Sequence, residues 1–249
     1  MRQNNQLFKK EQPHSLYMFK THYFKTLTST NKKARKFSTG HVIVAERQTK
    51  GRGRHKRKWS SGKGGIWLSI VLKPKTKNPA ELTFIAAIAV QKAIKKTCSL
   101  ETKIKWPNDI IYKNKKLCGI LTETVFKKEL EKMIVGIGIN ANNTLPYSLK
   151  NKAASLKNIL KKEVNQKRLI NSLLTQFQQL YKQYNKKEFR PILKEWKSLC
   201  GIFGKNVKII TTKKTYHGKA VNVDNNCNLI IKLSNGSLKK IIEGDVLFQ

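Results

Sequence analysis

Hydrophobic and polar positions along the first 200 residues alternate between short extended runs and one longer helical stripe. Apolar runs at His41–Glu46, Ile66–Leu72, Leu117–Thr124 and Met133–Ile139 predict strands. Between the second and third runs, apolar residues in Glu81–Thr97 recur at three- and four-residue steps, which is typical of a helix with one buried face. Strands that alternate with helices favour an α/β domain.

A second helix is predicted toward the end of this domain. Apolar residues recur at helical spacing from Leu169 to Tyr184. We expect Pro191 to end the pattern, because proline lacks the amide hydrogen that a helix interior needs. This helix should cover the sheet. Polar residues Lys113–Lys116 around Asn114 predict a turn before the third strand.

After Gly201 the pattern changes to short strands without helices. Turn residues separate four predicted strands, at Asn206–Thr212, Thr215–Val223, Asn228–Leu233 and Ser237–Ile242. Strands this close together indicate a small barrel. We therefore expect a polar N-terminal extension over residues 1–26, a main domain over 27–200 and a small β domain over 201–249.

The formal charge of +38 raises the question of nucleic-acid binding. Of the 52 basic residues 44 are Lys, and they are spread from Lys9 to Lys240. A protein that reads nucleic acid more typically concentrates Arg and aromatic residues on one face. The composition therefore favours a solvated surface that has drifted toward lysine, with DNA binding as the alternative.

Cysteine spacing and hydropathy narrow the class of protein. The four cysteines lie too far apart for a redox or zinc pair, and no His stands at ligand spacing from them: Cys98, Cys118, Cys200 and Cys227. No apolar stretch approaches the roughly 20 residues that span a bilayer, and the N-terminus lacks the apolar region of a signal peptide. We expect reduced thiols, no metal site, no membrane partner and a cytoplasmic location.

The segment with the clearest chemistry runs from Gly51 to Trp59, GRGRHKRKW. If it is extended, Arg52 and Arg54 point the same way, and their guanidinium groups can each donate two hydrogen bonds to a carboxylate or phosphate. A disordered basic turn explains the composition equally well. Trp59 favours ligand binding, because an aromatic ring after an anion-binding loop can stack on adenine, although a core position is the alternative.

Three further motifs carry polar groups or glycines at defined places. Asn108 and Asp109 follow a strand in KWPND, where an Asx turn alone would also explain them. Lys116 opens an apolar strand and can place an ammonium in a pocket. Gly136 and Gly138 alternate in another apolar strand, so one face of it carries no side chains and can take a ligand or another strand. No dinucleotide-binding GxGxxG is present.

In their order along the chain, these motifs resemble the biotin protein ligase family over about residues 27–248. The family's Ser-Thr-Asn, its Gln before GRGR, and its KWPND, KLxGIL and GIGIN motifs match Ser29–Asn31, Gln48, Lys105–Asp109, Lys116–Leu121 and Gly136–Asn140. The resemblance implies a mixed β-sheet flanked by helices, followed by an SH3-like C-terminal barrel. The chain departs from the family at Lys56, often a Gly, and at Arg47 and Thr49, which leaves the loop's shape open.

The resemblance also implies an activity. Such an enzyme activates biotin with ATP, in the presence of Mg²⁺, to biotinyl-5′-AMP and transfers it to a lysine of the biotin carboxyl carrier protein of acetyl-CoA carboxylase. The matched catalytic residues are Arg52, Arg54, Lys116 and Asp109; those for biotin are Ser29, Thr30, Asn31, Gln48, Arg52, Gly53, Arg54 and Lys116; those for ATP are Arg54, Arg57, Trp59, Asn108 and Asn140. Asp109 would orient or deprotonate the acceptor amine, and a purely structural role in the turn is the alternative.

Two other functions stay open. A lipoate protein ligase runs the same chemistry on a related fold, and a nucleic-acid-binding protein or biotin-sensing repressor would use the charge. A helix-turn-helix module of about 60 residues does not fit before the first motif, so we expect a short form without an N-terminal DNA-binding domain and without specific DNA binding. Whether two copies join at sheet edges is also left open.

Overall fold

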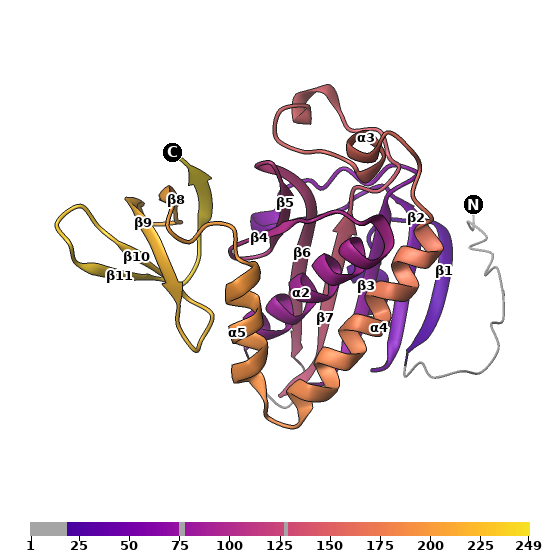
Figure 1. Ribbon diagram of the computed structural model, residues 1–249. Coiled ribbons are helices and arrows are strands. Elements are labelled where there is room, and N and C mark those ends of the chain that lie inside the picture. The colour runs from indigo at the N-terminus through magenta and orange to yellow at the C-terminus, as the bar shows by residue number, and fades with distance from the viewer. Residues whose placement is uncertain (1–18, 75–77, 127–128) are drawn as a thin grey trace.

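A computed structural model describes residues 19–74, 78–126 and 129–249. They form a seven-stranded mixed sheet with helices on both faces and a separate five-stranded antiparallel sheet (Figure 1). The large sheet has the order β1 (Lys20–Leu27), β2 (His41–Gln48), β3 (Ile66–Leu72), β7 (Leu130–Ile139), β6 (Lys115–Phe126), β5 (Asp109–Tyr112) and β4 (Lys103–Lys105). The β1–β2 pair is parallel and the others are antiparallel. The predicted fold class is confirmed.

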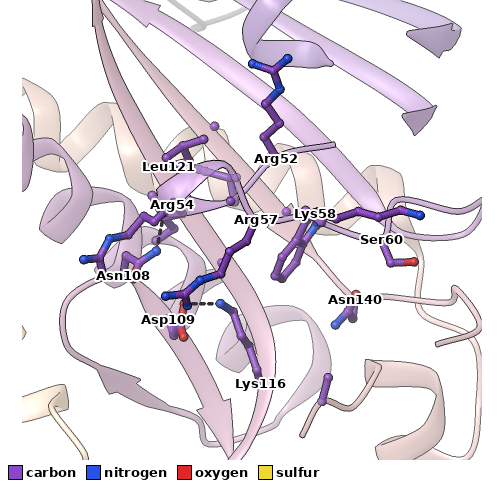
Figure 2. A pocket seen from close by; sticks show the side chains of 18 of the residues that line it. Arg52, Arg54, Arg57, Lys58, Ser60, Asn108, Asp109, Lys116, Leu121 and Asn140 are labelled. Carbon is purple, nitrogen blue, oxygen red and sulfur yellow. Dashed lines mark hydrogen bonds and ion pairs between the residues drawn. The ribbon is translucent and has the colours of Figure 1, made fainter. Parts of the chain in front are cut away.

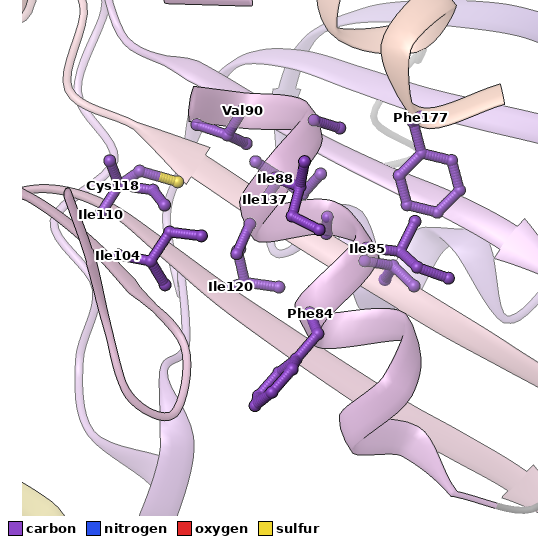
Figure 3. Close-up of a cluster of buried hydrophobic side chains, with 14 of the residues drawn as sticks. Phe84, Ile85, Ile88, Val90, Ile104, Ile110, Cys118, Ile120, Ile137 and Phe177 are labelled. Carbon is purple, nitrogen blue, oxygen red and sulfur yellow. The ribbon is translucent and has the colours of Figure 1, made fainter. Parts of the chain in front are cut away.

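One face of this sheet is covered by α2 (Pro79–Cys98), α4 (Gln166–Asn185) and α5 (Phe189–Leu199) (Figure 1). Helix α2 lies between the sheet and the other two helices, which is why most of its residues are buried. It supplies Phe84, whose ring stacks on Trp196 of α5 at 3.9 Å between centroids. Figure 3 shows this large core, where Ile120 and Ile137 of the sheet meet α2.

The other face carries a smaller core and, beside it, a hollow. The smaller core contains Phe24, Leu27, Ala34, Ile43, Ala45, Val71 and Ile134, under the short helix α1 (Thr30–Ala34). Side chains alternate between the faces of a strand, so Ile134, Gly136 and Gly138 of β7 all belong to this face. Because the last two are glycines, the apolar cover stops after Ile134 and space remains above the sheet.

The C-terminal sheet has the order β11 (Leu238–Ile241), β10 (Leu229–Lys232), β9 (Thr215–Val223), β8 (Asn206–Ile210) and β12 (Asp245–Phe248). The four predicted strands are confirmed, and β12 is a fifth that the pattern did not reveal. A buried hydrogen bond joins the two sheets, since Trp106 Nε1 donates to the carbonyl of Cys227 at 2.9 Å. This contact ties the small sheet to the KWPND turn.

The structure corrects two expectations. Strand β1 begins at Lys20, so residues 20–26 belong to the large sheet and not to an extension; residues 1–18 lie outside the described part of the chain. Pro191 does not end α4, which stops at Asn185, but lies in the first turn of α5. The first turn tolerates proline because its amides have no helical partners.

Two smaller features complete the picture. The predicted turn is confirmed by the left-handed backbone of Lys113 and Asn114, although Lys115 and Lys116 already belong to β6. Among the helices of the described residues, none combines the length and the apolar character that crossing a bilayer requires.

Candidate active site

The hollow beside the smaller core is part of a cavity of about 1140 Å³ (Figure 2). Its walls come from α1, from the loop between β2 and β3, from the KWPND turn and from β12. This volume lies slightly above the roughly 300–1,000 Å³ that is usual for small-molecule sites. Ten Lys or Arg and three Asp or Glu residues line it. The cavity therefore suits two ligands that carry negative charge.

Glycines form the floor of the cavity. A Cβ atom on Gly138 would lie 2.5 Å from Trp59 Nε1, and one on Gly119 would lie 3.1 Å from Trp59 Cζ3. A Cβ on Gly136 would lie 2.3 Å from Asn31 Oδ1. The prediction that these glycines leave one face of the strand bare is confirmed, and the indole of Trp59 lies on that bare face.

One end of the cavity is lined by the neutral polar residues Ser29, Thr30 and Gln48. Together with Ser61, which is hydrogen-bonded to Gln48, we call them the Gln48 network. Gln48 Oε1 accepts hydrogen bonds from Thr30 N at 2.7 Å and Thr30 Oγ1 at 3.1 Å, while Gln48 Nε2 donates to Ser61 Oγ at 2.9 Å. Ser29 caps α1 by accepting from Lys32 N at 3.4 Å. Together these bonds fix the start of α1 against the end of β2.

Asn31 has a role that sequence did not reveal. Its Nδ2 donates to Glu123 Oε2 at 2.6 Å, and its Oδ1 accepts from Ser69 Oγ at 2.6 Å. Glu123 also pairs with Arg35 at 3.2 Å. Because both ends of the Asn31 amide have partners within the protein, this side chain positions α1 on the sheet beside the cavity.

The loop from Gly51 to Trp59 is a hydrogen-bonded hairpin, which contradicts a disordered turn. Trp59 N donates to the carbonyl of Gly51 at 2.9 Å, and Gly53 N donates to that of Arg57 at 2.8 Å. A Cβ on Gly51 would lie 2.4 Å from Ser61 Oγ and 2.6 Å from the carbonyl oxygen of Trp59, so glycine is required there. At the tip, Lys56 adopts φ 58° in the left-handed region, which explains why a glycine also suits this place.

The expectation that Arg52 and Arg54 point the same way is wrong. Arg52 is exposed and points away from Arg54 and from the ion pair below it (Figure 2). The chain is extended only as far as the Arg52–Lys58 bridge, and from Gly53 it turns through a short 3₁₀ segment. The alternation that would align the two side chains therefore does not apply.

The other end of the cavity, which we call the charged end, gathers Arg54, Asn108, Asp109 and Lys116. Lys116 Nζ lies 2.6 Å from Asp109 Oδ1 and 5.0 Å from the ring centroid of Trp59. Arg54 Nη1 donates to Asn108 Oδ1 at 3.4 Å and to the carbonyl of Gly244 at 3.2 Å. Burial lowers the pKa of Arg54, and nearby carboxylates, Asp245 first among them, oppose that shift.

The C-terminal sheet completes this end of the cavity through contacts with the hairpin tip. Arg57 pairs with Asp245, and His55 Nε2 lies 3.7 Å from Glu243 Oε2. Burial raises the pKa of Asp245, but the opposing effect of the nearby cations, Arg57 first among them, is larger. The pKa of Asp245 therefore lies below its usual value. The sequence analysis named Arg57 but missed Glu243 and Asp245, because 188 positions separate Arg57 from Asp245 and no motif marks the two carboxylates.

The residues matched to ATP also line the cavity. Asn140 is 3% exposed, and its Oδ1 accepts from Asn143 Nδ2 at 3.3 Å. Asn108 Nδ2 donates to the carbonyl of Ile120 at 2.7 Å, which holds the KWPND turn against β6. Among the described residues, no group of three or more His, Cys, Asp or Glu side chains could hold a metal ion.

In chemical terms, the cavity joins neutral hydrogen-bonding groups to a cluster of cations across a floor of glycines, on which the Trp59 indole lies. Such a site can hold a neutral polar ring at one end and an anion at the other. The cations can then offset the repulsion between that anion and a second one.

Comparisons with known proteins agree with this geometry. Residues 22–140 match the biotin/lipoate A/B protein ligase family, and residues 202–249 match the biotin protein ligase C terminal domain. The bifunctional ligase/repressor BirA of Bacillus subtilis is 36% identical over 237 residues, which cover 90% of this chain and 72% of that protein. The biotin–acetyl-CoA-carboxylase ligase of Paracoccus denitrificans is 27% identical over 82% of this chain and 90% of its own.

A solved structure is similar over nearly the whole chain. The biotin protein ligase from Aquifex aeolicus in complex with biotin and ATP has a TM-score of 0.83 and 31% identity, covering 92% of this chain and 98% of that one. The fold, both domain matches and the similarity to full-length relatives lead to one conclusion: the chain belongs to the biotin protein ligase family.

Proposed function

We propose that this ligase activates biotin with ATP to biotinyl-5′-AMP and transfers the biotinyl group to a lysine of a biotin carboxyl carrier domain. The observation that carries the proposal is the division of the cavity into the Gln48 network and the charged end, with the glycine floor between them. The Aquifex aeolicus relative was solved with biotin and ATP, and the name of the Paracoccus denitrificans relative specifies acetyl-CoA carboxylase. The proposed reaction takes place in the cytoplasm, because ATP is available there.

Biotin fits this division by its chemistry. Its ureido group is a neutral donor and acceptor, and Ser29, Thr30 and Gln48 offer neutral partners of both kinds. Its ring and alkyl chain need an apolar surface without protruding side chains, which the glycine floor supplies once Trp59 moves aside. Its carboxylate then reaches Lys116.

In the first half-reaction two anions must meet. A carboxylate oxygen of biotin attacks the α-phosphorus of ATP, and pyrophosphate leaves. Lys116 and Arg54 offset the repulsion between these anions and stabilise the charge that grows on the α-phosphoryl group. Trp59 stacks on adenine and Asn140 holds it, while Arg57 binds phosphate. Mg²⁺ enters as part of the nucleotide substrate, with most of its ligands from phosphate and water.

In the second half-reaction the acceptor amine attacks the carbonyl carbon of the adenylate, and AMP leaves. Asp109 faces the cavity beside Lys116. When Lys116 turns toward phosphate, the carboxylate of Asp109 is released to orient the amine and accept its proton. The side chain of Asn108 holds the KWPND turn against β6, which leaves the Asp109 side chain for chemistry.

Transfer of labelled biotin to a carboxyl carrier domain tests the proposal. We expect ATP-dependent labelling of one acceptor lysine, abolished when that lysine is replaced by Arg. A parallel assay with labelled lipoate and its acceptor domain tests the related activity. Labelling of the lipoate acceptor in preference to the biotin acceptor would contradict the proposed substrate.

A further inference from the structure

Lys105 lies beside the charged end without a role in the reaction described so far. It is the last residue of β4 and pairs directly with Asp109 of β5. Residues opposite each other in an antiparallel pair project to the same face, and Ile104 points to the large core on the other side. Lys105 and Asp109 therefore enter the cavity side by side, and both line it.

The ammonium of Lys105 is short of a counter-ion. Asp109 is engaged by Lys116 at 2.6 Å, and Asp245 is engaged by Arg57. Within the described parts of the chain, no carboxylate lies within 4 Å of Lys105 Nζ, which lies over the ring of Phe248 at 5.5 Å from its centroid. Burial lowers the pKa of Lys105, and Lys116 lowers it further against the opposing effect of Asp109. A partly desolvated cation of this kind favours an incoming anion.

The sheet order indicates which anion that is. The floor glycines lie on β7 and β6, Lys116 on β6, Asp109 on β5 and Lys105 on β4, the outer strand. A biotin carboxylate above the floor meets the α-phosphate near Lys116. The two remaining phosphates then extend outward, over β5 toward β4 and the wall formed by Phe248 of β12.

We propose that Lys105 binds the β- and γ-phosphates of ATP and then the pyrophosphate leaving group, an inference that rests on the proposed function. In this step the bond between the biotin carboxylate oxygen and the α-phosphorus forms. The bond from the α-phosphorus to the bridging oxygen breaks, and its electron pair leaves with pyrophosphate. Lys105 donates hydrogen bonds to the charge that develops there and need not transfer a proton.

Biotin-dependent exchange of labelled pyrophosphate into ATP, measured on the full chain, tests this role. For Lys105→Met we expect the KM for pyrophosphate and for ATP to rise about tenfold to hundredfold, the usual loss for a hydrogen bond to a charged group. The KM for biotin should change less than about twofold, and Lys105→Arg should recover most of the loss. Lys103→Met is the matched control, because Lys103 lies on the same strand and face but is exposed and outside the cavity.

The outcomes separate this inference from the proposed function. Wild-type protein without biotin-dependent exchange would overturn both. Exchange by the wild type with unchanged pyrophosphate and ATP constants in Lys105→Met would overturn the role of Lys105 alone. A fall in kcat with unchanged KM values would also contradict the role of Lys105. That result would mean that Lys105 acts in the chemical step, as proposed for Asp109, and not in binding the phosphates. If Lys105→Met does not fold, the affinity for pyrophosphate is measured by calorimetric titration of Lys105→Arg and Lys103→Met instead. Weaker pyrophosphate binding by Lys103→Met would contradict the assignment to Lys105.

Discussion

The two ends of the cavity are built in different ways. The Gln48 network consists of buried or half-buried neutral groups whose hydrogen bonds measure 2.7–3.4 Å. The hairpin tip at the charged end instead contacts the C-terminal sheet through exposed ion pairs. The Arg57 side chain there is 59% exposed and that of Asp245 is 31% exposed.

This difference indicates that the neutral end is preformed, whereas the residues of the charged end can exchange their partners. A buried polar group that loses its partner costs about 1–3 kcal/mol, so the neutral end keeps its shape with or without ligand. Exposed ion pairs contribute about 0–1 kcal/mol, so phosphate can replace Asp245 as the partner of Arg57 at little cost. In the proposed reaction, the neutral end therefore selects the substrate and the charged end rearranges around the reacting anions.

The largest effect should follow loss of a cation at the charged end. Lys116→Ala and Arg54→Ala each remove a charge that, in the proposed reaction, faces the α-phosphoryl group, and such losses lower kcat by about 10²–10³-fold. Biotin-dependent pyrophosphate exchange measures this, with Lys115→Ala, an exposed neighbour, as the control. Full activity in both variants would refute the assignment of these residues.

Filling the floor between the two ends should come next. In Gly138→Ala the new methyl would stand on the glycine floor, where we propose that the ring and alkyl chain of biotin lie, and overpacking of this kind costs about 1–3 kcal/mol. We expect the Kd for biotin, measured by calorimetry, to rise about tenfold to hundredfold. Gly62→Ala is the control, because nothing lies within 4 Å of a Cβ there. Equal weakening in both variants would exclude the floor as the cause.

Replacing Gln48, which joins the hydrogen bonds of the neutral end, should affect the KM for biotin and not that for ATP. Gln48→Ala leaves Thr30 N and Ser61 Oγ without this partner, at a cost of about 1–3 kcal/mol. The KM for biotin should rise about tenfold while that for ATP stays nearly constant. Steady-state kinetics with each substrate varied in turn measure this. An equal rise in both KM values would contradict the assignment of the neutral end to biotin alone.

The smallest effect should come from the contact between Arg57 and Asp245. A double-mutant cycle with Arg57→Met and Asp245→Asn should give a coupling of about 0.2–1 kcal/mol in the free energy of unfolding. Because the pKa of Asp245 is lowered in the folded protein, the coupling is present above its usual value of about 4 and declines as the pH falls through the lowered one. A coupling that grows on acidification would contradict this sign.

Periodicity predicted the main elements well, because Glu81–Thr97 and Met133–Ile139 repeat their apolar residues over several turns or pairs. It missed β1, whose exposed positions weaken the alternation, and it missed β5 and β12, which have only four residues each. Strands β1 and β12 are also edge strands, where fewer side chains are buried and the hydrophobic signal is weak.

The site shows the same limit at the level of single residues. Motif order selected Gln48 and Lys116, which both line the cavity, yet the direction of Arg52 depends on a turn at Gly53 that composition does not specify. The role of Lys105 depends on which carboxylates are already paired, and Asp245 reaches the hairpin from the far end of the chain. Contacts of this kind follow from tertiary structure, so sequence spacing does not contain them.

The central claim, that a neutral end recognises biotin and a charged end activates it, is tested most directly by adenylate formation in a single turnover. Labelled ATP is mixed with excess enzyme and either biotin or lipoate, and the acyl-adenylate is separated and counted. The account predicts biotinyl-5′-AMP from wild type, much less from Lys116→Ala at saturating biotin, and normal yield from Gln48→Ala only when biotin is raised. Equal adenylate from lipoate, or a loss in Gln48→Ala that excess biotin does not restore, would contradict it.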